Sequence, residues 1–410
     1  MSLFESNQEW ISGNLKKITF PSDQVENSEF INSKFADKVF LGAGELQSEN
    51  NQTLKFEAVK RAEEKIACQK WNEDYLLPQG DKEFLTLARS FLFGVNTFQG
   101  ELSKNLVSFQ TLGATGAIRL AFSFIKKYME GKIYIPQLTW PFAKLIAEEV
   151  GLSHEEFDFF DLNKQEIKFE NLLSVIQKAP KKSFLFLQDV ANIPLGLDLT
   201  IDEWTRVIKV IRENEMCLII DSAFQGYSTG DFETDSQIVR FILQENIPFF
   251  IAQTFSKSMG LYGERIGCLH VRLFEDSEKI KKLLEEKAKL LWLSPNVYGA
   301  RLVKIILQDP QLLKLWKEEF FQIHSRIKEN RELLQKALIK YEVKGKWDNL
   351  NKQNGIFIFV PLNEKQIIFI KEKYHIYNLD LCRINLSSIT KQDIERLTIA
   401  LKEALDSKGQ

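Results

Sequence analysis

Short apolar runs alternate with longer amphipathic stretches between about residues 105 and 270. Each run ends at Gly, Pro or polar residues, which is typical of strands that are buried on both faces. The expected strands are LVSF (106–109), IYI (133–135), FLFL (184–187), CLII (217–220), FFIA (249–252) and CLHV (268–271). Helices between such strands indicate an α/β fold in which a mainly parallel sheet is covered by helices on both sides.

Helical spacing is clearest before the CLII run. Thr200 and Glu203 have the spacing of a capping box, and an apolar stripe follows them at helical spacing. Near the C-terminus the pattern predicts a long helix over 306–340, a strand over 355–360 and a helix over 390–406.

The change of pattern along the chain predicts two domains in its 410 residues. We expect an N-terminal arm over residues 1–46 that also contributes to a small domain. A large α/β domain would follow over 47–310, and residues 311–410 would complete the smaller α+β domain.

Composition excludes several classes of protein. Lys plus Arg number 54 and Asp plus Glu number 56, so the formal net charge is -2, which predicts no binding to nucleic acid or anionic lipid. No apolar run approaches the roughly 18 residues of a membrane helix, and the N-terminus lacks the pattern of a signal peptide. We therefore expect a cytoplasmic protein.

Cysteines and histidines do not form a metal motif. The four cysteines are Cys68, Cys217, Cys268 and Cys382, and the four histidines are His154, His270, His324 and His375. None has C-x-x-C or H-x-x-x-H spacing, so no metal site is expected. The thiols of Cys217 and Cys268 lie in strand-like runs and are predicted to be buried.

Candidate chemistry appears where the strands end, because ligands of open parallel sheets bind beyond the carboxyl ends of the strands. After LVSF, the segment from Gly113 to Gly116 opens a helix and includes Thr115, which favours a phosphate site. A tight turn would explain its glycines equally well. After IYI, Trp140 would place an aromatic face near the same edge, although core packing is an alternative.

Charged residues follow the CLII and FFIA strands. Asp221 ends an apolar run, and a buried carboxylate requires a cation or hydrogen bonds. Thr254, Ser256, Lys257 and Arg265 follow FFIA, where they could hold a phosphate or form a solvated loop. Taken with the two features above, they provide a phosphate cradle, an aromatic face, a carboxylate for a ring nitrogen and a lysine. Pyridoxal 5'-phosphate (PLP) requires this combination.

These residues lie in segments that resemble the class I, fold-type I PLP-dependent aminotransferases of the aspartate/aromatic subgroup. The most specific segment is IAQTFSKSMGLYGERIGCLHV (251–271). Further counterparts occur in the same order along most of the chain: LGAGE (41–45), YLLPQG (75–80), QTLGATGAIR (110–119), TWPF (139–142), PLGLDLTIDEW (194–204), DSAFQGYSTGD (221–231), KQNGIF (352–357) and CRINLSSI (382–389). The resemblance implies the fold-type I architecture, with a large cofactor-binding domain and a smaller α+β domain.

The resemblance implies a role for each matching residue. Lys257 matches the lysine that forms the Schiff base and moves the proton, and Asp221 matches the acid that keeps the pyridine nitrogen protonated. Trp140 matches the indole stacked on the ring. The phosphate cup is matched by Ala114, Thr115, Thr254, Ser256 and Arg265.

The resemblance also implies how substrate binds and how the subunits assemble. Arg383 matches the arginine that clamps the α-carboxylate, and Gly44 lies in a matching substrate segment. Tyr75 matches a tyrosine that reaches the phosphate from the neighbouring subunit. A homodimer with shared active sites is therefore expected.

Three positions depart from the family. Ile193 and Phe224 replace the asparagine and the tyrosine that bond the cofactor's ring oxygen. The arginine that reads a dicarboxylic side chain from the other subunit aligns with Lys289. These changes affect cofactor tuning and aspartate specificity, whereas the lysine, the acid and the α-carboxylate clamp are retained.

We therefore predict a PLP-dependent aminotransferase. It would move an amino group between an L-amino acid (aspartate, aromatic or related) and a 2-oxo acid such as 2-oxoglutarate, by a ping-pong mechanism. The residues leave open a diverged lyase, decarboxylase or racemase, and a PLP-binding protein with little turnover.

Overall fold

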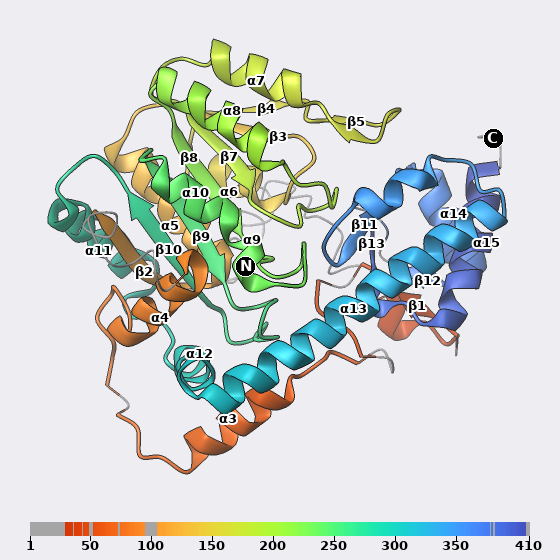
Figure 1. The fold of residues 1–410 in the computed structure, drawn as a ribbon, viewed down its shortest axis with the longest axis horizontal. Helices are drawn as coiled ribbons and strands as arrows, with labels where there is room; N and C mark the ends of the chain where they lie inside the picture. The colour runs from red at the N-terminus through yellow and green to blue at the C-terminus, as the bar shows by residue number, and fades with distance from the viewer. Residues whose placement is uncertain are drawn as a thin grey trace, which may run out of the picture.

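A computed structural model describes residues 29–406, except residues 36, 43, 49–51, 73, 95–104, 378, 380 and 381. Residues 1–28 of the predicted N-terminal arm lie outside the described residues. A long helix, α13 (Pro310–Lys340), runs from the part that holds the main sheet to the part that holds the C-terminal helices (Figure 1).

The main sheet has seven strands in the order β2-β10-β9-β8-β7-β3-β4. Their bounds are Leu106–Leu112 (β2), Ile133–Pro136 (β3), His154–Phe157 (β4), Phe184–Gln188 (β7), Cys217–Ser222 (β8), Phe249–Thr254 (β9) and Ile266–Arg272 (β10). Neighbours from β9 through to β4 are parallel, and β10 is antiparallel to both β9 and β2. The predicted mainly parallel α/β fold is confirmed.

Alternating side chains of each strand pack on opposite faces of this sheet, as strand pleating requires. In β8, Leu218 and Ile220 belong to one core cluster, and Cys217 and Ile219 belong to the other. The first face is covered by α4 (Lys82–Phe93), α7 (Phe169–Lys178), α8 (Ile201–Glu213) and α10 (Gln237–Gln244). The second is covered by α5 (Gly113–Tyr128), α6 (Phe142–Glu149) and α11 (Ser277–Trp292).

The predicted capping box is present at the start of α8. The Thr200 hydroxyl accepts a hydrogen bond from the backbone N–H of Glu203 at 3.2 Å, and the Glu203 carboxylate accepts from the Thr200 N–H at 2.8 Å. Trp204 is fully buried behind this cap. The helix therefore begins where the sequence predicts.

The predicted continuous helix over 306–340 is wrong at one point. Helix α12 (Tyr298–Gln308) ends before Asp309, and α13 begins at Pro310. Proline has no N–H and disfavours helical geometry in the preceding residue, so it starts a helix more readily than it continues one. The Asp309 carboxylate accepts hydrogen bonds from Gln311 N and Leu312 N, which caps the new helix.

The second part of the molecule combines segments from both ends of the described chain. Strand β1 (Val39–Phe40) pairs in parallel with β12 (Ile376–Tyr377), and β11 (Phe357–Phe359) pairs antiparallel with β13 (Arg383–Asn385). These pairs bring the segment around residue 44 next to the C-terminal strands. Its helical elements are η3 (Trp347–Lys352), α14 (Glu364–Tyr374), η4 (Leu386–Ser388) and α15 (Lys391–Asp406).

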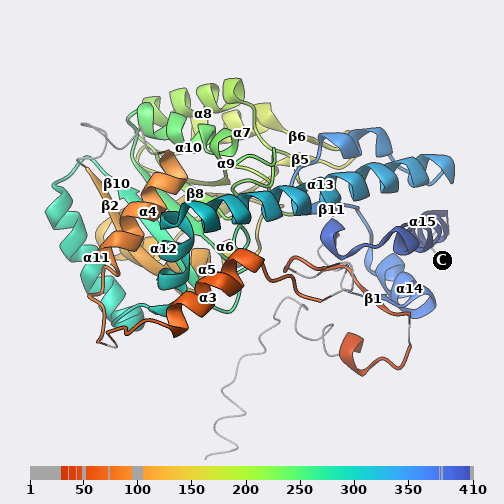
Figure 2. The same cartoon turned by 60° about the horizontal axis from the view of Figure 1, so that its bottom comes forward.

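The remaining elements are short or lie along α13. Figure 2 shows α3 (Glu57–Ala67) beside α13, with which it packs. The others are β5 (Phe160–Asp161), β6 (Glu166–Ile167) and α9 (Phe232–Asp235).

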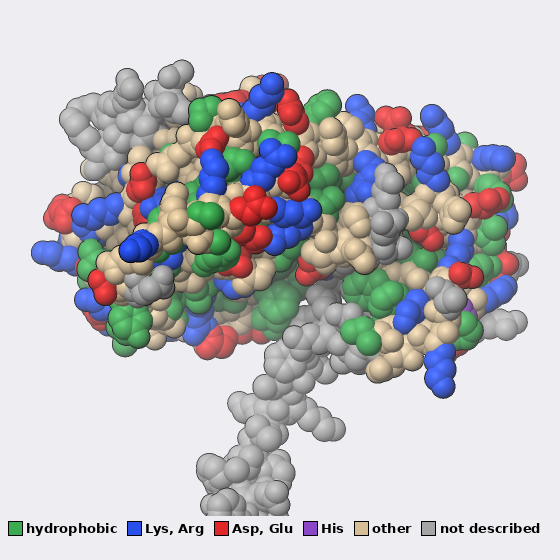
Figure 3. Space-filling model, turned by 90° about the horizontal axis from the view of Figure 1, so that it is seen from below, with side chains coloured by type: hydrophobic (Ala, Val, Ile, Leu, Met, Phe, Trp, Pro, Cys, Tyr) green, Lys and Arg blue, Asp and Glu red, His purple; other side chains and the backbone are tan. Residues whose placement is uncertain are grey.

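The described surface has no strong bias of charge in the view of Figure 3, where acidic and basic side chains are interspersed. Among the described helices, none is long and apolar enough to cross a membrane. In the same ranges, no group of three or more His, Cys, Asp or Glu residues could hold a metal ion. All four cysteines are free thiols, and Cys217 and Cys268 are buried as predicted.

Candidate active site

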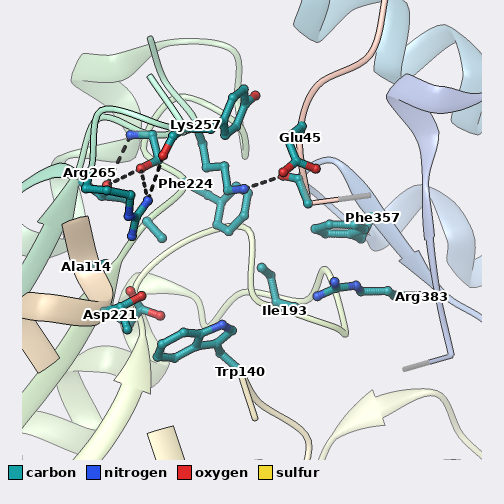
Figure 4. Close-up of a pocket in the computed structure, with 16 residues that line it drawn as sticks. Glu45, Ala114, Trp140, Ile193, Asp221, Phe224, Lys257, Arg265, Phe357 and Arg383 are labelled. Atoms are coloured by element: carbon teal, nitrogen blue, oxygen red, sulfur yellow. Dashed lines mark hydrogen bonds between the residues drawn. The ribbon is translucent and has the colours of Figure 1, made fainter. Parts of the chain in front are cut away.

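A cavity of about 270 Å³ lies between the main sheet and the β11–β13 pair (Figure 4). It is lined by Gly44, Glu45, Ala114, Thr115, Trp140, Ile193, Asp221, Ala223, Phe224, Thr254, Ser256, Lys257, Tyr262, Arg265, Phe357 and Arg383. The cavity thus brings together residues that lie up to 339 positions apart in the chain.

Asp221 lies within β8, whose described span continues past the predicted end of the strand to Ser222. It is paired in register with Gln188 on β7, and the Gln188 amide donates to one carboxylate oxygen at 3.5 Å. The other oxygen, Oδ1, is buried and has no hydrogen-bond partner within the described chain. Burial raises the pKa of Asp221 to about 7. A cationic group in the cavity would stabilise the ionised carboxylate.

Lys257 follows β9 and extends its side chain into the cavity (Figure 4). Its Nζ donates to the carbonyl oxygen of Gly44. Burial lowers the pKa of Lys257 to about 8, and the neighbouring Glu45 carboxylate opposes this shift. A substantial fraction of the amine is therefore neutral near physiological pH.

Hydroxyl, guanidinium and backbone groups meet on one wall of the cavity. Thr254 Oγ1 lies 3.0 Å from Ser256 Oγ, and Arg265 Nη1 lies 3.5 Å from the same oxygen. Arg265 approaches the start of α5 so closely that a Cβ on Gly113 would lie 2.7 Å from its Nη2. Gly113 has φ +69°, so glycine meets both the conformational and the spatial requirement.

Arg383 lies on the opposite wall. Its guanidinium stacks 4.7 Å from the Phe357 ring centroid, and Nη2 donates to Gly42 O at 3.3 Å. The side chain is buried, with 9% of the residue exposed. This packing holds a planar fork of donors at the cavity edge, which suits a carboxylate.

Trp140 and the two departing residues also line the cavity. Figure 4 shows the Trp140 indole beside Asp221, with Ile193 between Trp140 and Arg383. Ile193 and Phe224 are buried, at 7% and 2% exposed. Asn192, next to Ile193, is not among the lining residues. The apolar side chains therefore face the cavity at positions where the family has polar ones.

Two predicted site residues lie outside the lining of this cavity. Tyr75 is 88% exposed, and Lys289 lies on the exposed face of the last turn of α11. Both were predicted to act in the neighbouring subunit's site, so their roles stay predictions.

Four lining or supporting residues had no predicted role. Gln188 orients Asp221, Phe357 supports Arg383, and the Tyr262 hydroxyl accepts from Leu46 N at 2.8 Å. Glu45 places a second carboxylate in the cavity. Tyr262, Phe357 and Glu45 lie in motifs that carry the resemblance, and Gln188 ends an apolar strand, but their contacts depend on the fold.

The residues present fit PLP. The partnerless Oδ1 of Asp221 suits a protonated ring nitrogen, and Trp140 offers a ring face beside it. The wall formed by Thr254, Ser256 and Arg265, next to the N-terminus of α5, suits a phosphate. Lys257 supplies an amine with lowered pKa between these groups and Arg383.

Comparison with known sequences places this arrangement in a family. Residues 36–401 match the family model "Aminotransferase class I and II". A cytoplasmic aspartate aminotransferase of Schizosaccharomyces pombe is 30% identical over 388 residues, covering 92% of this chain and 94% of the relative. A cytoplasmic aspartate aminotransferase of Dictyostelium discoideum is 32% identical over 375 residues, covering 90% and 84%.

Solved structures have the same fold. The cytoplasmic aspartate aminotransferase of Saccharomyces cerevisiae superposes with a TM-score of 0.92 at 26% identity, covering 97% of this chain and 99% of that one. An aromatic-amino-acid aminotransferase of Burkholderia pseudomallei, covalently bound to pyridoxal phosphate, superposes with a TM-score of 0.91 at 23% identity, covering 99% and 100%. The fold is that of the fold-type I enzymes. The chain belongs to the class I and II aminotransferases and is a PLP-dependent enzyme that transfers an amino group between an amino acid and a 2-oxo acid.

Proposed function

We propose that the cavity is the transamination site, with Lys257, Asp221 and Arg383 as its central residues. The observation that carries this proposal is their convergence on one cavity from the loop after β9, from β8 and from β13. An amine, a carboxylate that lacks a partner and a guanidinium are the three groups that the reaction requires from the chain.

When bound, PLP supplies an electron sink that stabilises negative charge at the substrate's Cα. Asp221 would hold a proton on the ring nitrogen, because its ionised form is favoured by a cation at that position. Lys257 would hold the cofactor and then carry a proton to and from Cα through Nζ. Its lowered pKa leaves the amine available as a base near neutral pH.

The other lining residues would orient the reactants. Arg383 would hold the α-carboxylate through bidentate hydrogen bonds, and the backbone of Gly44 would border the same subsite. Trp140 would stack on the ring, next to the Phe224 position. The phosphate would lie among Ala114, Thr115, Thr254, Ser256 and Arg265, and Tyr75 of a second subunit would complete this cup.

The proposed substrates are an L-amino acid of the aspartate, aromatic or related group and a 2-oxo acid, with 2-oxoglutarate as a candidate acceptor. The names of the relatives support aspartate and aromatic amino acids. Both half-reactions would use the same cavity in ping-pong order. The domain limits at 46/47 and 310/311, and a cytoplasmic location, belong to the same proposal; relatives named mitochondrial also match.

A homodimer with shared sites is supported by an apolar surface near β2. Gln110 joins two loops, since its N–H donates to Gln79 O at 2.9 Å and its side-chain amide donates to Asn296 O at 2.5 Å. These loops carry exposed large apolar residues: Tyr75, Leu77, Leu293 and Tyr298. A second copy of the chain would cover them.

The test is a half-reaction screen of the purified PLP-loaded enzyme. Each amino acid is added alone while absorbance reports conversion of the cofactor to its amine form, and conversion is expected with at least one of them. Borohydride reduction followed by peptide mapping should place the pyridoxyl group on Lys257. A label on another residue, or no conversion with any amino acid, would overturn the proposal.

A further inference from the structure

Glu45 is an acidic residue in the cavity to which the proposed function assigns no task. Its side chain lines the cavity on the side of Phe357, beside Lys257 (Figure 4). Among the described residues, its carboxylate has no hydrogen bond and no ion pair, and its charge acts on Lys257, where it opposes the lowering of the pKa. A carboxylate that faces a substrate cavity and accepts no hydrogen bond there can accept one from a cationic ligand group.

The backbone around Glu45 is fixed on three sides. The carbonyl of Glu45 accepts from Asn385 Nδ2 at 2.9 Å, and the carbonyl of Gly44 accepts from Lys257 Nζ. Leu46 is fully buried, and its N–H donates to Tyr262 Oη at 2.8 Å. Because residues 44 and 46 are held in this way, the side chain at 45 is directed into the cavity by the fold.

The charges that line the cavity show what Glu45 could bind. The cations are Lys257, Arg265 and Arg383, and the anions are Asp221 and Glu45. In the proposed function, Arg265 meets the phosphate, Asp221 meets the ring nitrogen and Arg383 meets the α-carboxylate. Lys257 is engaged with the cofactor. Glu45 is the charged lining residue to which the proposed function assigns no ligand group, and a positive group on the substrate would complement it.

The cavity walls near Glu45 indicate the form of that substrate. Phe357 lies between Arg383 and Glu45, and Ile193 lies beside Arg383 (Figure 4). The Tyr262 ring also lines the cavity, with its centroid 4.9 Å from Lys257 Nζ. Methylene groups pack on such surfaces, while a terminal ammonium or guanidinium reaches a carboxylate.

We propose that Glu45 is a specificity-determining residue that selects amino acids with a terminal cation on an aliphatic side chain. The inference rests on the proposed function, in which Arg383 holds the α-carboxylate. The same carboxylate repels the second carboxylate of aspartate, glutamate or 2-oxoglutarate. Within the proposed function it therefore favours a cationic amino acid over aspartate, and a 2-oxo acid without a second carboxylate over 2-oxoglutarate.

The first test compares half-reaction kcat/KM for L-lysine, L-norleucine and L-glutamate, whose side chains are all unbranched and differ in terminal charge, glutamate being the shortest. The wild type should prefer lysine to norleucine by about 10-fold or more, the scale of one charge-assisted hydrogen bond, and should use glutamate least. A norleucine rate equal to or above that of lysine would overturn the inference while leaving transamination intact. No conversion of any amino acid would instead refute the proposed function.

Two variants separate selectivity from an effect on Lys257. Glu45→Gln keeps the size of the side chain, so it should lower the lysine-to-norleucine ratio of kcat/KM to about 1. An effect on Lys257 that is common to both amino acids cancels in this ratio. Glu45→Arg should reverse the order and favour glutamate over lysine, a gain that a misfolded protein cannot show. An equal loss for all three amino acids would mean that Glu45 acts on the base and not on the side chain.

A binding measurement provides a readout without turnover. The probe 5-guanidinopentanoate carries a carboxylate and a guanidinium but no α-amino group. Hexanoate, which has the carboxylate and an uncharged end, is its control. Calorimetry on the loaded enzyme should show tighter binding of the guanidino acid by about 10-fold, a difference that falls with added salt and is lost in Glu45→Gln. Equal affinities in the wild type would overturn the inference.

Discussion

Buried ionisable groups have unusual proton affinities, and Lys257 and Asp221 show this in opposite directions. Burial disfavours the charged form of each, so it lowers the pKa of Lys257 to about 8 and raises that of Asp221 to about 7. A cofactor with a cationic ring nitrogen removes the cost for Asp221. The neutral amine of Lys257 is then available for reaction, and both shifts serve the proposed site.

The Lys257 shift predicts how cofactor capture depends on pH. The reacting form is the neutral amine, so the capture rate of apoenzyme should rise about tenfold per pH unit below pH 8 and level off above it. Stopped-flow absorbance after mixing apoenzyme with PLP measures the rate, and Lys257→Ala supplies the background. A rate that keeps rising to pH 10 would show that the lysine is not desolvated.

Phe224 leads to a prediction about the bound cofactor. Phe224→Tyr adds a hydroxyl that can donate to an anionic ring oxygen, and such a bond is worth roughly 1.5–3 kcal/mol. The pH midpoint of the cofactor's absorbance change should therefore fall by about one to two units. Phe224→Leu, which adds no donor, is the matched control and should not lower the midpoint. An unchanged midpoint in the tyrosine variant would mean that another group already serves the oxygen.

Arg383 yields a third residue-scale prediction. Removing two charge-assisted hydrogen bonds of roughly 1.5–3 kcal/mol each should lower kcat/KM by about 10²–10⁴-fold in Arg383→Ala for every amino acid. Retention of PLP by the variant serves as the folding control. Arg383→Lys keeps the charge without the planar fork, so it should recover only part of the loss. If the wild type used amines without a carboxylate better than amino acids, the assignment of Arg383 would be wrong.

At the scale of elements, the carboxyl ends of the parallel strands and the loops that follow them carry the cofactor-site residues, and the helices support them. Helix α8 packs Trp204 against the sheet face below β7 and β8, the strands that present Gln188 and Asp221. Its start depends on the capping box of Thr200 and Glu203.

The cap has a measurable value. Thr200→Ala should lower the free energy of unfolding by about 1 kcal/mol, since it leaves N-terminal amides of α8 without an acceptor. Thr205→Ala is the matched control, because the Thr205 hydroxyl donates to Ile201 O within the same exposed turn and should cost less than about 0.5 kcal/mol. Urea denaturation followed by circular dichroism measures both, and equal losses would show that the cap is unimportant.

At the scale of the whole molecule, the proposed dimer links Tyr75 of one subunit to Lys257 of the other. The homodimer of each variant, Tyr75→Ala or Lys257→Ala, should be nearly inactive or should bind the cofactor weakly. Hybrids reassembled from the two variants should regain activity, because one site of each heterodimer combines an intact Lys257 with an intact Tyr75. Co-expression with two affinity tags isolates the hybrid, and mixed homodimers are the control. If the hybrid regains no activity, Tyr75 acts in the site of its own subunit or in neither site.

Local patterns in the amino-acid sequence were sufficient to predict the fold class and the residue types of the candidate site. The apolar runs predicted the strands next to Asp221 and Lys257, and the capping box at Thr200 predicted the start of α8. Both signals are local, because the spacing of apolar residues and a helix cap each depend on a few neighbouring residues. The same patterns misplaced the break at Asp309, where a proline interrupted an otherwise continuous helical pattern. The motifs also carried the family resemblance, and with it the expected residues of the site.

Which side chains contact one another depends on how distant segments pack. Glu45 and Arg383 come from opposite ends of the chain, and they face one cavity because β1 pairs with β12 and Asn385 holds the carbonyl of Glu45. The lowered pKa of Lys257 follows from burial, which no local spacing encodes. Contacts between distant residues depend on how the sheet and the helices pack. The specificity proposed for Glu45 could therefore be inferred only once the fold was known.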